Sequence, residues 1–242
     1  MKRLLFILAL LANGIVSSAN PMVVGGVAYT AVTDSTVAVT AIEGFSYYGK
    51  LTIPETINYE NSQYSVVTIG DEAFYNCYCL TGITLPKTLV EIGNFAFYDC
   101  RNLKSIVLPE SLERIGNNAF WHCEKLTKVV IPDKVEYIPE ACFEGCSLLS
   151  GVTIGKSVTT IRRNAFRKCS SLASIIIPAS VGSIKEKAFM DCSKLATVTF
   201  ANKQNVKIDE RSSFANTPYG NAHSKNPIKN DPRFKIRNSV TY

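Results

Sequence analysis

Histidine is almost absent from this chain, which has only His122 and His223 in 242 residues. Histidine is the commonest general acid or base and a common zinc ligand, so its scarcity argues against both kinds of site. The sequence also has no glycine-rich phosphate loop, no G-x-S-x-G and no H-E-x-x-H, and its acidic residues are scattered. We therefore expect no catalytic residue, no metal site and no cofactor.

Long hydrophobic runs are equally scarce. The one marked apolar run, residues 4–12, follows Met1-Lys2-Arg3 and precedes Ser17-Ser18-Ala19. A charged start, a short apolar middle and a small-residue exit are typical of a secretory signal peptide, and this run is too short to span a bilayer. We predict a signal peptide over residues 1–19 and an exported protein without a membrane span, for which nucleic acid is not an expected partner.

A 23-residue pattern fills the middle of the chain. Its six copies start at Ile69, Ile92, Ile115, Ile138, Ile161 and Ile184. A fixed period of this size is the signature of a solenoid, in which each repeat is one coil stacked on the next. A phenylalanine recurs at Phe74, Phe97, Phe120, Phe143, Phe166 and Phe189, and a leucine follows six residues after each. These columns predict one continuous core.

The end of each repeat predicts a short strand. Ile83 and Leu85 have the spacing of alternate inward residues, and the same pair of apolar positions recurs in every copy. Pro86 and its counterparts in three other repeats end the strand, as expected for a residue that lacks an N–H. The outward residues between them form an exposed strand face.

The flanks differ from the repeats. Residues 20–68 contain short β-prone runs separated by turn formers, which predicts a small antiparallel β cap over the first coil. The repeats occupy residues 69–206. Ile208 to Phe214 copies half a repeat with one residue inserted, so we expect 207–242 to hold a partial repeat, an irregular C-terminal cap and a basic tail.

Cysteine is frequent, with eight residues, and an exported chain with eight cysteines commonly has disulfides. Six of them instead form one column of the repeat, and Cys142 takes a position that is alanine elsewhere. We interpret these seven as small buried core residues, with disulfides as the alternative. Cys79 falls in a variable column and is expected outside, either reactive or inert.

The pattern I-x-x-x-A-F-x-x-C-x-x-L-x-x-I-x-L-P-x-x-L resembles the BspA-like leucine-rich repeat. The resemblance covers about two-thirds of the chain that follows the signal peptide. It implies a mainly β solenoid, a right-handed coil with parallel strands on one face. It also implies a bacterial protein that is secreted, periplasmic or on the cell surface, with adhesion to a host or cell-surface protein or glycan as the expected function.

Three surfaces are candidates for binding such a partner. The strand face contributes Lys104, Val107, Thr127, Lys128, Val130 and Ile176. An aromatic stripe in the column after phenylalanine contributes Tyr75, Tyr98 and Trp121. A polyanion patch, suited to sulfated glycans, contributes Arg162, Arg163, Arg167 and Lys168. Each set has an alternative reading as ordinary solvated or partly covered surface.

Charge is divided along the chain. Residues 20–149 have 8 Lys+Arg and 15 Asp+Glu, a net charge of −7, whereas residues 150–242 have 16 and 5, a net charge of +11. Because sequence order is spatial order in a solenoid, the rod should be acidic at one end and basic at the other. The division leaves open a structural subunit that assembles end to end; the oligomeric state is not predicted.

Overall fold

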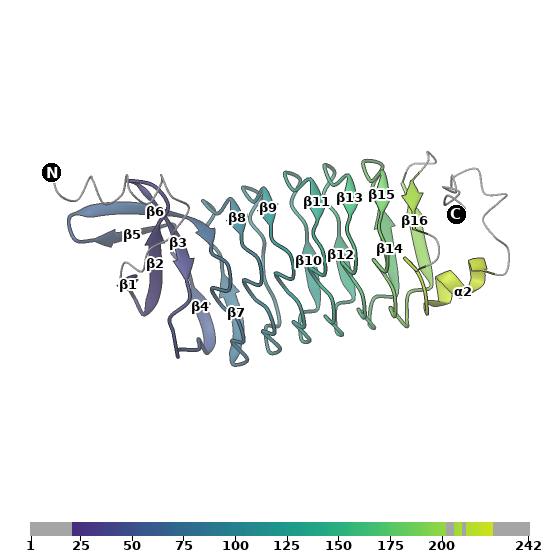
Figure 1. The fold of residues 1–242 in the computed structure, drawn as a ribbon, viewed down its shortest axis with the longest axis horizontal. Helices are drawn as coiled ribbons and strands as arrows, with labels where there is room; N and C mark the ends of the chain where they lie inside the picture. Colours follow the sequence, from purple (N-terminus) through teal and green to yellow (C-terminus); the bar gives the residue numbers. More distant parts are fainter. Residues whose placement is uncertain (1–20, 202–205, 210–211, 225–242) are drawn as a thin grey trace, which may run out of the picture.

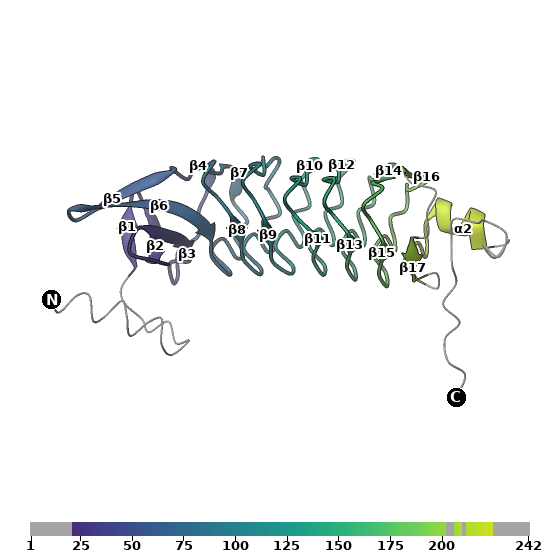
Figure 2. The same ribbon diagram turned by 90° about the horizontal axis from the view of Figure 1, so that it is seen from above.

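The chain forms a straight rod of stacked coils with a β cap at one end and a short helix at the other (Figures 1 and 2). The computed structural model describes residues 21–201, 206–209 and 212–224. The predicted signal peptide and residues 225–242 of the predicted tail lie outside the described residues. The predicted mainly β solenoid is confirmed.

The N-terminal cap comprises six strands. They are β1 (Met22–Val24), β2 (Val27–Ala31), β3 (Thr36–Thr40), β4 (Gly49–Thr52), β5 (Thr56–Tyr59) and β6 (Ser62–Ile69). Pairing is antiparallel for β1–β2–β3 and for β5–β6, as predicted, but β3 and β6 are parallel. The strand β6 also joins the first repeat, where Ile69 pairs in parallel with Ile92.

The predicted strands follow one another along the rod and form three parallel pairs. They are β7 (Leu80–Thr84), β10 (Lys128–Val130), β12 (Gly151–Thr153), β14 (Ser174–Ile177) and β16 (Thr197–Phe200). They pair as β4–β7, β10–β12 and β14–β16. The second repeat contributes only a bridge between Ile83 and Ile106.

A second parallel ladder, on another side of each coil, was not predicted. It consists of β8 (Glu91–Ile92), β9 (Arg114–Ile115), β11 (Tyr137–Ile138), β13 (Thr160–Ile161), β15 (Ser183–Ile184) and β17 (Lys207–Ile208). The first two continue the sheet of the cap, and the other four form a sheet of their own. Each isoleucine of the repeat start points inward and the residue before it points outward. The expectation of strands on one face is therefore incomplete, because two-residue strands leave too short an alternation to see in a sequence.

The core is a single row of aromatic rings surrounded by aliphatic side chains. The six predicted phenylalanines are fully buried. Neighbouring rings stack with centroids 5.0–5.4 Å apart, close to the spacing of about 4.8 Å between strands. Each ring contributes about 1.5–3 kcal/mol of transfer free energy. Like side chains in register thus stack from coil to coil along the rod.

The cysteine column lies inside, as predicted. Cys79 is exposed and the other seven cysteines are buried, all as free thiols. From the second copy on, each column thiol donates to the carbonyl of a phenylalanine 26 residues earlier, as Cys123 Sγ does to Phe97 O at 3.3 Å. Each of these carbonyls also accepts the backbone N–H of the cysteine three residues later in its own turn, as Phe97 O does from Cys100 N at 3.2 Å, so the thiol supplies its second hydrogen bond.

The C-terminal end is closed by the partial repeat and by helix α2 (Pro218–Ser224). Phe214 continues the ring row at 5.2 Å from Phe189, and Tyr219 packs against Phe214. The C-terminal cap predicted within residues 207–242 as irregular contains this short helix. Thr217 Oγ1 accepts a hydrogen bond from Gly220 N at 2.8 Å and Pro218 follows it, a capping signal present in the sequence.

Candidate binding surfaces

The strand face is apolar at its centre. Val107, Val130 and Ile176 are 80%, 56% and 64% exposed, because their neighbours Ile106, Val129 and Ile175 take the inward positions of the same strands. Lys104, Thr127 and Lys128 are also exposed beside them. The outward positions of this face include no carboxylate in any of the six repeats. The result is an uncharged row, in which Thr153 separates Val130 from Ile176, with two lysines beside it.

The aromatic stripe is a closed stack. Tyr75 and Tyr98 lie face to face with centroids 4.8 Å apart, and Tyr98 and Trp121 at 4.3 Å. Tyr75 is 41% exposed, while Tyr98 and Trp121 are half-buried. Burial, followed by the nearby Tyr75, raises the pKa of the Tyr98 phenol. Because the rings cover one another's faces, a ligand would contact mainly their edges.

His122 extends this stack, which its variable column did not indicate. Its ring lies 3.5 Å from that of Trp121 and nearly parallel to it. The next coil has Gly145 beneath the ring, where any side chain would overlap His122. Asp99, in the coil before, is buried and forms two hydrogen bonds with Arg101, at 2.8 and 3.0 Å. These contacts indicate a packed surface ridge.

The residues of the predicted polyanion patch lie in different electrostatic surroundings. Arg167 pairs with Glu144 at 3.0 Å and faces Asp191 at 3.6 Å, and Glu144 is itself buried. Arg163 lies between Glu140 at 3.8 Å and Glu186 at 3.9 Å. Lys168 is exposed. Carboxylates of the coils before and after thus offset much of the positive charge of the two arginines.

The repeat register already contained the signal for these pairs. Glu140 and Arg163 occupy one column in consecutive coils, and so do Glu144 and Arg167. Residues 23 apart lie side by side, so an acidic residue followed by a basic one in a column predicts an ion pair. Reading each coil's cations as a group, without the neighbouring coils, missed this.

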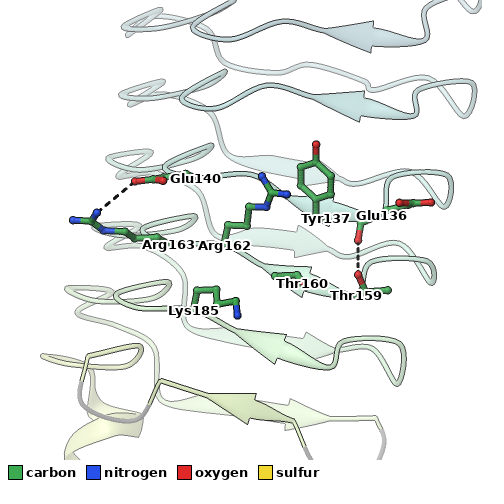
Figure 3. A pocket seen from close by; sticks show the side chains of 8 residues that line it. All are labelled: Glu136, Tyr137, Glu140, Thr159, Thr160, Arg162, Arg163 and Lys185. Carbon is green, nitrogen blue, oxygen red and sulfur yellow. Dashed lines mark hydrogen bonds and ion pairs between the residues drawn. The ribbon is translucent and has the colours of Figure 1, made fainter. Parts of the chain in front are cut away.

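Arg162 belongs to a hollow on the second ladder. The hollow has a volume of about 510 Å³ and opens widely to solvent. The Arg162 guanidinium lies over the Tyr137 ring, 3.7 Å from its centroid, with Thr160 and Lys185 on the next two coils (Figure 3). Glu136, Glu140, Thr159 and Arg163 complete the lining. Of these eight residues, only Arg162 and Arg163 belong to a predicted site.

Over residues 21–201, 206–209 and 212–224, no three His, Cys, Asp or Glu side chains are grouped so that they could hold a metal ion. The same residues include no helix that is long and apolar enough to cross a membrane.

The stacked coils, the buried columns and the parallel ladders define a leucine-rich-repeat solenoid. The profile of the BspA type leucine rich repeat region matches residues 67–196 and 113–230, with six copies in the family profile. The chain belongs to this family. Repeats of this class typically form binding scaffolds and not catalytic centres. No curated protein matches the sequence.

Solved structures support the same fold. A leucine rich cell surface protein of Faecalibacterium prausnitzii is 31% identical, with a TM-score of 0.60, over 76% of this chain and 55% of its own. A leucine rich repeat protein of T. pallidum is 29% identical, with a TM-score of 0.67, over 75% of this chain and 82% of its own. The pneumococcal vaccine antigen PcpA is 20% identical, with a TM-score of 0.60, over 74% of this chain and 53% of its own, and shares the fold. The chain thus spans about half the length of the first and third of these proteins.

Proposed function

We propose that this chain is an exported bacterial binding module that acts at the cell surface and adheres to a protein partner through its strand face. The observation that carries the proposal is the exposed row of Val107, Val130 and Ile176. An apolar centre with a polar rim is the usual composition of a protein-binding patch. The cell-surface protein of Faecalibacterium supports the proposed location.

This row favours a particular kind of partner. Lys104 and Lys128 flank the two valines in neighbouring coils, and none of the outward residues of this face is acidic. A matching surface would have apolar side chains at its centre and carboxylates around them. We therefore expect a folded protein with an acidic-rimmed apolar patch, such as a host extracellular matrix protein.

Binding to a panel of immobilised extracellular matrix proteins tests the proposal. The wild-type protein should bind at least one of them saturably, and Val107→Asp with Val130→Asp should abolish that binding. Ser157→Asp with Ala179→Asp, at two exposed positions outside both the strand face and the hollow, is the matched control and should bind as wild type does. Absence of binding to the whole panel, or equal binding by the double variant, would show that the strand face is not the adhesive surface.

Polyanion binding through the predicted patch has weaker support. Arg163 and Arg167 face carboxylates on both neighbouring coils, which lowers their attraction for a highly sulfated glycan. End-to-end assembly is also less favoured, because the β cap and α2 cover the two ends of the repeat stack. Light scattering over a salt series would reveal such assembly as a mass that falls as salt is raised.

A further inference from the structure

The hollow on the second ladder departs from the rest of its surface. In the column after the repeat isoleucine, the first four repeats have Gly70, Gly93, Gly116 and Pro139, which have no long side chain that could rise above the ladder. The next two have Arg162 and Lys185, which are exposed and stand above it. Two cations therefore project from adjacent coils at the place where the hollow forms (Figure 3).

Arg162 is held ready for an anion. The Arg162 guanidinium rests on the Tyr137 ring. This contact restricts the movement of the guanidinium and covers one of the two faces of that group. Neither Arg162 nor Lys185 has a carboxylate partner among the described residues, unlike Arg163 and Arg167. A guanidinium with its N–H edge free is matched to the two oxygens of a carboxylate or sulfate.

The remaining lining restricts the charge of the ligand. Thr160 is paired in register with Tyr137 and lies between the two cationic side chains, where its hydroxyl can donate or accept. Glu136 and Glu140 line the same hollow and can accept hydrogen bonds from hydroxyl groups. Their negative charge would repel a ligand with many anionic groups. Mixed donors and acceptors around one cationic pair suit a ligand with one negative charge and several hydroxyls.

We propose that this hollow binds one acidic saccharide unit, with its carboxylate on Arg162 and Lys185 and its hydroxyls on Thr160 and the two glutamates. The site is separate from the strand face, so either can be correct without the other. A protein with both would contact a polypeptide on one side and an acidic glycan on another.

Calorimetric titration and saturation-transfer NMR with D-glucuronate test the proposal, with D-glucose and inorganic sulfate as comparison ligands. Glucuronate should bind saturably and more tightly than either. Arg162→Gln should weaken glucuronate at least tenfold, which corresponds to about 1.4 kcal/mol. Lys185→Gln should weaken it several-fold, and Tyr137→Leu should do the same although it leaves both charges in place.

Lys168→Gln is the matched control, because it removes one exposed positive charge outside the hollow and should leave glucuronate binding unchanged. The thermal midpoint of each variant checks that the fold is retained. Three results would overturn the proposal: no saturable binding of glucuronate, an equal loss in Lys168→Gln and Arg162→Gln, or sulfate binding as tightly as glucuronate, which would mean that the hydroxyls are not recognised.

Discussion

Raising the pH should unfold this protein through its core thiols. Burial raises the pKa of most cysteines of the repeat core, and the effect is strong for Cys100, Cys123, Cys142, Cys146 and Cys169. In the unfolded chain a thiol ionises near pH 8.5. Above that pH the unfolded state loses protons that the folded state keeps, so the free energy of unfolding falls as the pH rises.

The size of the effect follows from the number of thiols. At pH 9.5, one unit above the unfolded pKa, each of these five thiols lowers the free energy of unfolding by about 1–1.5 kcal/mol. Together they lower it by roughly 5–7 kcal/mol, which is a large part of the 5–15 kcal/mol typical of a folded domain. Below pH 8 the same thiols are protonated in both states and the loss disappears.

Urea unfolding followed by circular dichroism at pH 7.0, 8.5 and 9.5, with a reductant present, measures this dependence. Staying below pH 10 avoids the tyrosines, since burial raises the pKa of Tyr29 to about 12 from an ordinary value near 10. Cys142→Ala places in this column the alanine that other repeats have there. Between pH 7.0 and 9.5 the free energy of unfolding of this variant should fall by about 1–1.5 kcal/mol less than that of the wild type, which is the contribution of one thiol. Equal midpoints at pH 7.0 and 9.5 would refute the reasoning.

Three further predictions concern single positions. Phe120→Ala, in the middle of the ring row, should lower the free energy of unfolding by about 3–5 kcal/mol in the same urea assay, and a loss below 1 kcal/mol would mean that the row is not the core. Titration of the native protein with Ellman's reagent should detect one thiol, Cys79, and eight after unfolding; two or more in the native state would contradict the buried column. Gly145→Ala should cost about 1 kcal/mol or more, because Gly145 has a positive φ and His122 fills the space above it, and should change Trp121 emission by moving the His122 ring; unchanged emission would mean that the two rings are not stacked.

The core could be predicted from the sequence because each coil contacts only the coils before and after it. Each coil repeats the last, so a column that is apolar in six copies must point to the same shared interior. That is why the sequence alone places Phe120, Leu126 and Cys123 in the interior. The strand face followed in the same way, from the alternation of Val129 with Val130.

The surface sites depended on contacts that a single coil does not contain. Arg167 and Glu144 are 23 residues apart, and only coil stacking turns two scattered charges into a pair. The second ladder rests on two-residue strands, too short to show a period, so the hollow above it was not foreseen. The aromatic stripe was foreseen as a row, but not that its rings would cover one another.

The sequence by itself determined the repeat, its period, the buried columns and the direction of the strand residues, because these follow from local periodicity and hydrophobic burial. Coil stacking decided which cations are neutralised and which remain free, because it brings residues 23 apart in the sequence side by side. It left Arg162 on the Tyr137 ring and Lys185 beside the same hollow, while Arg163 and Arg167 lie between carboxylates. The physical reason is that the electrostatic surroundings of a side chain in a solenoid are set by the coils above and below it.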